Sequence, residues 1–540
     1  MSNSSLFSFL LFLLFFSLLN LLSGFIINQN KLYPKEDDES WLHRQPPAAT
    51  PPTAGYPKSK LIGLILSFAV LIGILCLPTP SDLSTAGHRM IGILFFAIVL
   101  WISSAVSYPV SATMLTALTA VLLGTAPNID APTKILGTSN ALKIAISGYS
   151  TPAWALVAAA MFISVAMTKT GLDRRIALNV LSRIGTKTSR IYIGVIFTGF
   201  ILSFFVPSAT ARLACLIPII LGILDSLGIN RQSKLAALLV IGATQADTLW
   251  NIMVQTAAAQ NLVAVGFIST QLNTSVSWID WLLAAAPYSL VMVVIYYFLS
   301  MWLLKPDEHD LEGSQKELQQ HLQNLGPMTF NEKKLLVLSV ILLGFWATGG
   351  HLHKYDTTTT TVVAIALFLM PGIGIIDWKY AQSRIDWGSI VMFGAGISLG
   401  TALLKTKAAT WLANAFIHMF ALETLTIFAL LATITLFLIM IHLGFASATA
   451  LSSAMIPIVI SIVTAVNMPG INPIGLTVIA QFSICFGFIL PVNSPQGMVS
   501  YSSGTFEVKT FMKTGIPITI IGYIMLLVYA ATYWHWIGFV

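Results

Sequence analysis

Two short polar clusters with nearly the same sequence interrupt apolar stretches of this 540-residue chain. Residues 208–219 read SATARLACLIPI and residues 447–458 read SATALSSAMIPI, at an offset of 447 − 208 = 239. Polar, helix-breaking sequence inside an apolar segment is costly in lipid unless it lines a cavity. One such cluster in each half of a chain is typical of transporters with internal repeats, which bind substrate between the repeats.

The hydroxyl groups of these clusters are the first candidates for chemistry. Ser208, Thr210, Ser447 and Thr449 could bind anionic oxygens together with backbone N–H groups at the ends of broken helices. Serine and threonine can instead bond back to their own helix or pack between helices. Because both clusters end in the same Ile-Pro-Ile, we favour anion binding.

One arginine and one aspartate carry charge into these apolar stretches. Arg212 follows the first cluster, whereas Leu451 occupies the matching place in the second. A charge in this setting needs a partner. Arg212 would hold a substrate carboxylate with two parallel hydrogen bonds, pair with an acid such as Asp247, or reach a membrane interface. Asp247 would in turn bind a cation or a proton, or form a structural ion pair.

Two further breaks follow the clusters, at 256–261 and at 491–497. Prolines unwind the second break and free backbone carbonyls, which together with side-chain oxygens suit Na⁺. The candidate cation ligands are Ser208, Thr256, Asn261, Ser447 and Asn493. A proline kink without an ion is the alternative. We expect no other metal and no cofactor.

The composition is that of a helical membrane protein with many spans. It is 56% hydrophobic and 9% charged, against about 25% charged in soluble domains. The net charge of +7 indicates basic cytoplasmic loops, and no nucleic-acid partner is expected. We find no zinc-protease, phosphate-loop or nucleophile-elbow motif, so the sequence does not predict an enzyme. Apolar spans are expected at 61–78, 89–105, 107–124, 152–168, 190–206, 210–225, 235–266, 279–304, 333–349, 357–376, 387–404, 424–443, 450–466, 474–500 and 513–537.

The spans group into two repeats. Residues 1–60 form an N-terminal appendage with a possible extra span and a proline-rich linker. The first repeat, with a preceding helix, covers 61–304; the second covers 333–540. An amphipathic cytoplasmic linker at 305–332 joins them, marked by Leu311, Leu318 and Leu322. We expect re-entrant hairpins at 190–225 and 424–466, and broken helices at 235–266 and 474–511.

Loop charges predict that the repeats are inverted. Residues 169–190 contain six lysines and arginines, and the equivalent residues 405–423 contain two. By the positive-inside rule the first loop is cytoplasmic and the second is not. Inverted halves suit alternating access, in which one hairpin guards each side of the membrane.

These motifs resemble the divalent anion:sodium symporter family over roughly residues 60–540. That family carries a Ser-Asn-Thr motif at each hairpin tip, matched here by 208–210 and 447–449, and a Thr-Pro-Pro-Asn-like break, matched by 494–497 and in degraded form by 258–261. The resemblance implies a homodimer with a scaffold and an elevator-type transport domain. It also assigns substrate contacts to Ala209, Ala448, Ser494 and Pro495, beside the tip hydroxyls and Arg212.

The departures from the family pattern concern coupling. Both motif asparagines, which in the family contact substrate and help to bind sodium, are alanines here, at Ala209 and Ala448. The surroundings of Arg212 look like the carboxylate-exchanging branch, whereas 491–495 look like the sodium-coupled branch. The sequence therefore leaves coupling by Na⁺ or by counter-exchange open.

The sequence as a whole predicts a multi-pass protein of the plasma (inner) membrane. We expect a secondary active transporter of small divalent organic anions, namely C4-dicarboxylates, 2-oxoglutarate or citrate, working by elevator-type alternating access. Sulfate or another inorganic divalent anion is the alternative substrate. A passive anion channel is the alternative of another class, and it fits poorly with two opposed hairpins.

Overall fold

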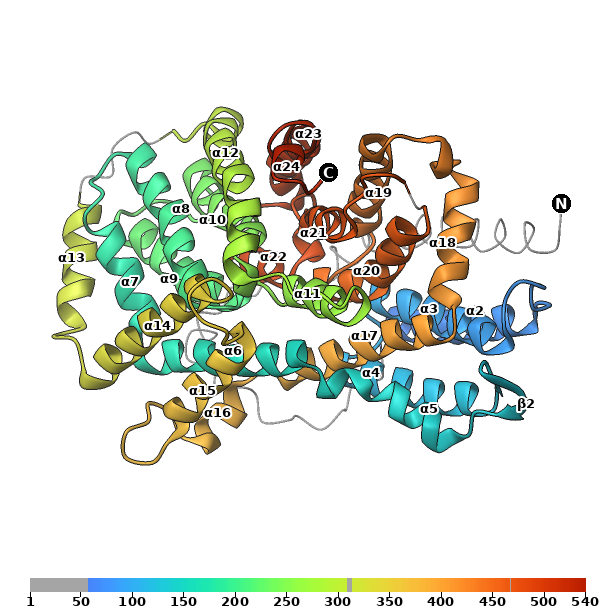
Figure 1. Ribbon diagram of the computed structural model, residues 1–540. Coiled ribbons are helices and arrows are strands. Elements are labelled where there is room, and N and C mark those ends of the chain that lie inside the picture. Colours follow the sequence, from blue (N-terminus) through green and yellow to red (C-terminus); the bar gives the residue numbers. More distant parts are fainter. Residues whose placement is uncertain (1–56, 308–312, 467) are drawn as a thin grey trace.

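The computed structural model describes residues 57–307, 313–466 and 468–540, which are almost entirely helical (Figure 1). Ten of the described helices are long and apolar enough to cross a membrane, and shorter apolar helices of 10–17 residues lie among them. The N-terminal appendage expected at 1–60 lies outside the described residues except at its end, where the first described helix begins at Lys58.

The part of the chain before the linker contains α2 (Lys58–Cys76), α3 (Thr85–Ile102), α4 (Tyr108–Leu118), α5 (Thr138–Ala145), α6 (Pro152–Thr170), α7 (Leu172–Leu181), α8 (Thr188–Phe205), α9 (Ala209–Ser226), α10 (Lys234–Met253), α11 (Ala259–Gln271) and α12 (Trp278–Leu304). A π-helical segment (Thr119–Leu123) continues α4, and 3₁₀ turns occur at Ser147–Ser150 and Gln255–Ala257.

The remainder contains α13 (Ser314–Asn324), α14 (Phe330–Thr348), α15 (Thr357–Leu369), α16 (Trp378–Arg384), α17 (Trp387–Lys405), α18 (Ala408–Met419), α19 (Ile427–His442), α20 (Ala448–Ala465), α21 (Pro473–Ile484), α22 (Pro495–Ser502), α23 (Val508–Ala531) and α24 (Tyr533–Trp536). Here 3₁₀ turns occur at Leu422–Thr424 and Pro491–Asn493.

A small β-hairpin departs from the all-helical expectation. Strand β1 (Pro127–Asn128) pairs antiparallel with β2 (Ala131–Ile135). The side-chain oxygen of Asn128 accepts a hydrogen bond from the Asp130 amide at 3.1 Å, which is the local bond that favours a tight turn at asparagine. The hairpin lies between two of the expected spans, so the protein remains a helical membrane protein.

The residues expected to form the two hairpins fold as the helix pairs α8–α9 and α19–α20. Helix α8 ends before Pro207, which lacks an N–H group and forces the preceding Val206 into an extended conformation (φ −117°, ψ 97°). Helix α9 then restarts after Ser208. In the second pair α19 ends at His442 and α20 restarts after Ser447. Each pair therefore encloses a non-helical tip.

Both expected broken helices are interrupted in the structure. The first consists of α10 and α11, separated by residues 254–258. The second consists of α21 and α22, separated by residues 485–494. It ends at Ser502 rather than at 511, because α22 stops short of a turn at Gly504 with positive φ (70°) and α23 starts at Val508.

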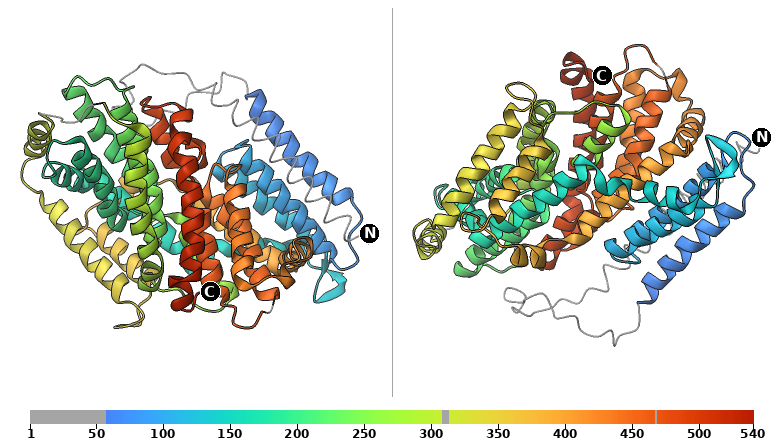
Figure 2. Two further views of the ribbon diagram at one scale, coloured as in Figure 1. Left: turned by 90° about the horizontal axis from the view of Figure 1, so that it is seen from above. Right: turned by 60° about the horizontal axis from the view of Figure 1, so that its bottom comes forward.

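Each broken helix contacts both hairpins. Helix α10 packs on α8 and α9, and α21 packs on α19 and α20. The second helix of each broken helix packs on the hairpin of the other half: α11 packs along α20, and α22 packs along α9. Contacts such as Gln245 Nε2 to the Phe488 carbonyl (2.9 Å) join the two broken helices directly. Residues 254–258 and most of residues 485–494 are buried. Figure 2 shows the packed helices from two further directions.

The linker between the halves forms a helix on the surface. Leu318 of α13 is buried and Leu322 is half-buried, whereas Leu311 lies outside the described residues. Helix α13 packs on α7 and α9, and the Gln315 side chain donates to the Ser182 carbonyl at 3.2 Å. Figure 1 shows α7 and α13 at one side of the molecule and α18 at the other.

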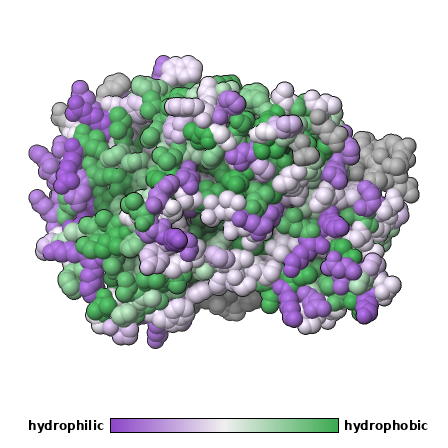
Figure 3. All heavy atoms as spheres, viewed as in Figure 1, coloured by the Kyte–Doolittle hydropathy of each residue, from purple (hydrophilic) through white to green (hydrophobic). Residues whose placement is uncertain are grey.

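The outer surface is apolar where lipid would contact it. Exposed side chains recur every four residues along α23, at Ile516, Ile520, Ile524 and Val528. This spacing puts an apolar stripe on the outward face of a helix. Figure 3 shows hydrophobic side chains over much of one face, with hydrophilic ones gathered at the edges over α13 and near α5 and β2. Helix α10, in contrast, is buried from Leu235 to Met253.

Candidate functional site

The serines of the repeated clusters cap the second helix of each hairpin in the same way. Ser208 has φ −144° and ψ 110°, and its hydroxyl oxygen accepts from the Ala211 amide at 3.3 Å. Ser447 has φ −151° and ψ 117°, and it accepts from the Ala450 amide at 3.3 Å. A serine at this position satisfies one backbone N–H of the first turn. The sequence repeat is thus also a repeat of local geometry.

The threonines of the clusters carry the hydroxyls that remain available. Thr210 and Thr449 are both half-buried, and within the described ranges neither side chain has a recorded hydrogen-bond partner. Ala209 and Ala448 stand between the serine and the threonine and contribute only methyl groups. Each tip therefore offers hydroxyls at a helix N-terminus, which is favourable for a carboxylate.

The residues that precede α11 and α22, the second helices of the two broken helices, share the same backbone conformation. Ser494 precedes α22 with φ −149° and ψ 145°, and its hydroxyl accepts from the Gly497 amide at 3.2 Å. Ala258 precedes α11 with φ −146° and ψ 136° but has no side-chain cap. Pro495 is exposed. Four helix N-termini, two at tips and two at breaks, thus occur in matched pairs.

Arg212 is enclosed by oxygen atoms at the first tip. Its Nε and one terminal nitrogen donate to the two carboxylate oxygens of Asp247, at 2.7 and 3.1 Å. The other terminal nitrogen donates to the carbonyls of Val206 (2.6 Å) and Ala257 (3.1 Å). The fifth N–H group donates to Asn251 Oδ1. All five N–H groups of the guanidinium are used, and both charged side chains are fully buried.

In this conformation these bonds join Arg212 and Asp247 in one buried ion pair. The arginine forms a buried ion pair and has no N–H group left for a substrate. Asp247 is neutralised by it rather than offered to an ion or a proton. The acceptors come from the tip, from α10 and from the break, so this oxygen cage holds three elements together.

At the second tip the backbone carbonyls accept hydrogen bonds from a neutral side-chain amide instead of from an arginine. The Nδ2 group of Asn493 donates to the carbonyls of His442 (3.0 Å), Leu443 (3.2 Å) and Phe445 (3.1 Å). In return, His442 Nε2 donates to the Asn493 carbonyl at 3.2 Å. Phe445 is the repeat equivalent of Val206, because 445 − 206 = 239. The equivalent carbonyl of each tip therefore accepts a hydrogen bond: that of Val206 from the charged Arg212, and that of Phe445 from the neutral Asn493 amide.

The other residues predicted to bind a cation are bonded within the protein. The Thr256 hydroxyl accepts from the Trp278 indole at 3.1 Å. The Asn261 amide donates to the Asn251 carbonyl at 2.7 Å, and its oxygen accepts from the Cys485 thiol at 3.5 Å. Asn493 Oδ1 accepts from the Leu490 amide at 3.2 Å. Within the described residues, no group of three or more His, Cys, Asp or Glu side chains could hold a metal ion.

Sequence reasoning missed a pair of buried glutamines. Gln245 and Gln481 are both fully buried on the first arms of the broken helices. They are repeat equivalents, because 481 − 245 = 236, the same offset as between Gln260 and Gln496. Gln245 donates to the Phe488 and Phe511 carbonyls, and Gln481 accepts from the Ser452 hydroxyl. The constant offset was the signal that could have found them.

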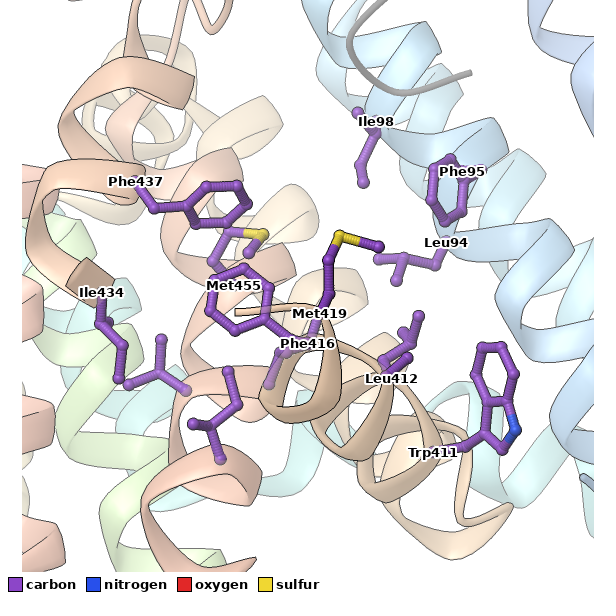
Figure 4. Close-up of a pocket in the computed structure, with 14 residues that line it drawn as sticks. Leu94, Phe95, Ile98, Trp411, Leu412, Phe416, Met419, Ile434, Phe437 and Met455 are labelled. Atoms are coloured by element: carbon purple, nitrogen blue, oxygen red, sulfur yellow. The ribbon is translucent and has the colours of Figure 1, made fainter. Parts of the chain in front are cut away.

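A separate pocket lies between α3 on one side and α18, α19 and α20 on the other (Figure 4). Its lining consists of aliphatic and aromatic side chains, among them Phe95, Phe416, Phe437 and Met455. Because the lining contains no hydroxyl, amide or charged group, it does not suit a divalent anion. The tips and breaks remain the candidate site.

Paired hairpins and paired broken helices in a helical membrane protein define a secondary transporter rather than an enzyme. The chain belongs to the divalent anion:sodium symporter family: residues 58–540 match the family model described as the sodium:sulfate symporter transmembrane region. The family resemblance expected from the sequence is therefore confirmed.

Relatives cover nearly the whole chain. A protein of Cupriavidus necator named "membrane protein" is 49% identical over 479 residues, 88% of this chain and 93% of its own length. The sodium-dependent dicarboxylate transporter SdcS of Staphylococcus saprophyticus is 26% identical, over 87% of this chain and 91% of its own. The inner membrane protein YbhI of Escherichia coli is 28% identical, over 88% and 97%. The chain is a multi-pass inner membrane protein.

The fold is also similar to that of a solved transporter. The crystal structure of the YdaH transporter of Alcanivorax borkumensis superposes with a TM-score of 0.52 and 14% sequence identity, covering 81% of this chain and 98% of that one. At this identity the likeness concerns the fold alone.

Proposed function

We propose that the chain carries small divalent organic anions, such as C4-dicarboxylates, 2-oxoglutarate or citrate, across the inner membrane by counter-exchange. The substrate class is supported by the SdcS relatives, which are named dicarboxylate transporters. It is supported as well by the repeated geometry of the tips, each of which presents hydroxyls and a helix N-terminus. A dicarboxylate has one carboxylate for each tip, whereas sulfate is a single oxyanion.

The observation that carries counter-exchange is the oxygen cage around Arg212. Tip and break carbonyls together with a buried carboxylate are the ligand set expected for Na⁺ in this kind of transporter. Here a guanidinium occupies that set with five hydrogen bonds. Because the charge of Asp247 is already balanced, Na⁺ would gain no net attraction there. The relatives' names include sodium dependence, so we infer that this chain has replaced the first cation by its own arginine.

The second tip supports the same proposal. Its carbonyls accept from the Asn493 amide, so they too are satisfied without an ion. Exchange of one dianion for another moves no net charge and needs no coupling ion. A carrier of this kind must instead be prevented from crossing empty.

Movement is proposed to be of the elevator type, with the hairpins and broken helices moving as one block. The packing of each broken helix on both hairpins supports this, because the four elements share a continuous buried interface. The six lysines and arginines of residues 169–190, against two in residues 405–423, support inverted repeats. A homodimer remains a proposal that rests on the family resemblance.

Uptake of labelled succinate into proteoliposomes tests this function. We expect uptake to require unlabelled dicarboxylate inside, to saturate, and to be the same in Na⁺ and in choline. Uptake driven by a Na⁺ gradient into empty vesicles would refute exchange. Uptake of labelled sulfate but not of succinate would refute the substrate class, and unsaturable uptake without internal anion would favour a channel.

A further inference from the structure

A glutamine stands at the start of the second helix of each broken helix. Gln260 is the second residue of α11 and Gln496 is the second residue of α22, at the repeat offset of 496 − 260 = 236. The first N–H groups of a helix have no acceptor inside it. Within the described residues, the backbone N–H groups of these two glutamines have no hydrogen-bond acceptor. Each break therefore presents a backbone N–H and a side-chain amide from one residue.

The side-chain amide of Gln496 is buried without a partner. The residue is 7% exposed, and its side chain forms no hydrogen bond to any described part of the chain. Its carbonyl accepts from the Ser500 hydroxyl at 2.9 Å, and Ser500 in turn bonds to Thr244 of α10. The helix is thus held in place while its first amide is unsatisfied. Buried polar groups of this kind are uncommon and costly unless something binds them.

Gln260 lies between the second break and the second hairpin. Its carbonyl accepts from the hydroxyl of Ser452 at 3.4 Å, five residues past Ser447 at the second tip. Its Nε2 lies 3.7 Å from the Cys485 sulfur of the second break, which is a weak acceptor. The equivalent helix α22 packs along α9, which begins at the first tip. The two glutamines therefore occupy equivalent places, each beside the hairpin of the opposite half.

We propose that Gln260 and Gln496 are substrate ligands, each of which holds one carboxylate of the dianion with its backbone N–H and its side-chain amide. This inference rests on the proposed function. The tips offer no amide side chain, because Ala209 and Ala448 stand between their serines and threonines. Amide N–H groups donate, and their hydrogen bonds to a carboxylate are stronger than those between neutral groups. Each carboxylate then lies between the hydroxyls of one tip and the amide of the opposite break.

Replacing Gln496 with leucine removes the amide and keeps a side chain of similar size. Because the amide has no partner in the substrate-free protein, Gln496→Leu should unfold at the same temperature as the wild type or at a higher one. A lost hydrogen bond to a charged group corresponds to about 10- to 100-fold in affinity. We expect the purified full-length variant to bind succinate about 10- to 100-fold more weakly in titration calorimetry.

The same experiment on Gln260→Leu tests the pairing. Its affinity for succinate should fall to a similar degree, and a loss in only one of the two variants would overturn the shared role. A lower unfolding temperature of substrate-free Gln496→Leu would show that its amide supports the fold, and this too would overturn the assignment.

Gln271→Leu is the matched control. Gln271 is half-buried in the last turn of α11, and neither polar atom of its side chain has a partner within the described residues. It follows Gln260 by 271 − 260 = 11 residues, about 16 Å along the helix. The variant removes the same kind of amide far from the break, so we expect wild-type affinity for succinate. Equal weakening in Gln271→Leu and Gln496→Leu would mean that packing is the cause, which contradicts direct binding.

Titration with sulfate separates this inference from the proposed function. If the wild type binds sulfate but not succinate, and Gln496→Leu weakens sulfate binding, the proposed substrate class fails and Gln496 remains an anion ligand. If the wild type and Gln496→Leu bind succinate equally, the glutamine assignment fails and the proposed function stands. A wild type that binds neither anion would refute both.

Discussion

Removal of Arg212 should turn the first tip into a sodium site. The side chains of Arg212 and Asp247 are both fully buried and lie 2.7 Å apart. Loss of one partner of a buried ion pair costs about 3–5 kcal/mol, because an unbalanced charge remains. In Arg212→Ala the carboxylate and the oxygens of Val206, Ala257 and Asn251 would line a vacated space. These are Na⁺ ligands, so Na⁺ should recover part of the loss.

The stability that Na⁺ binding restores to Arg212→Ala can be estimated from mass action. A ligand that binds only the folded state at a hundred times its dissociation constant stabilises by about 2.7 kcal/mol. We expect thermal unfolding of Arg212→Ala to occur at clearly higher temperature in NaCl than in choline chloride at equal ionic strength. The wild type should unfold at the same temperature in both salts. Purified protein in one detergent suffices for the measurement.

A second arginine in an ion pair, which is only partly buried, provides the control. Arg175 pairs with Glu332 at 2.6 Å, with side-chain exposures of 11% and 3%. Arg175→Ala should lose stability without gaining a response to Na⁺, because no hairpin tip borders that pair. Arg212→Lys keeps the charge but has three N–H groups for five acceptor bonds, so it should be destabilised and indifferent to Na⁺. Stabilisation of the wild type by Na⁺, or indifference of Arg212→Ala, would refute the built-in cation.

Two further predictions concern the tips and the packing beneath them. The double variant Ser208→Ala and Ser447→Ala should lose succinate uptake but still reach the membrane, because each lost cap costs only about 1 kcal/mol; normal uptake would exclude the tips from transport. Gly396→Ala should destabilise by about 1–3 kcal/mol, since its Cβ would clash with the Ser453 hydroxyl. Gly344→Ala, whose Cβ would meet nothing within 4 Å, should be neutral or stabilising in the same unfolding assay, because alanine favours the helix; an equal loss in both would refute the packing argument.

The hairpins and breaks could be predicted because their signals are local. Pro207 and Pro491 end helical conformation, and Ser208 and Ser447 favour the start of a helix. The structure places a tip or a break at each of these positions. The family and the membrane class followed from the same local motifs and from composition.

The contacts of the site depend on packing that the sequence does not contain. Asp247 lies 35 residues from Arg212, and only the packing of α9 on α10 brings the two side chains together. Before that packing was known, a substrate carboxylate was an equally good partner. The short β-hairpin was missed because an asparagine turn between long spans is a weak signal.

The two tips should differ in how readily they open. The carbonyl of Val206 is held at 2.6 Å by a guanidinium that is itself locked to Asp247, whereas that of Phe445 is held at 3.1 Å by the neutral amide of Asn493. Separating a buried ion pair costs about 3–5 kcal/mol, and a neutral hydrogen bond contributes about 1 kcal/mol.

The second tip should therefore open more easily than the first, because only neutral hydrogen bonds hold it. Hydrogen exchange of the substrate-free protein measures this as faster exchange at 443–447 than at Val206 and Ser208. Saturating succinate should slow the second tip more than the first, because the first is already closed by its own charge. Equal rates at both tips, or faster exchange at the first, would show that the arginine does not lock the hairpin.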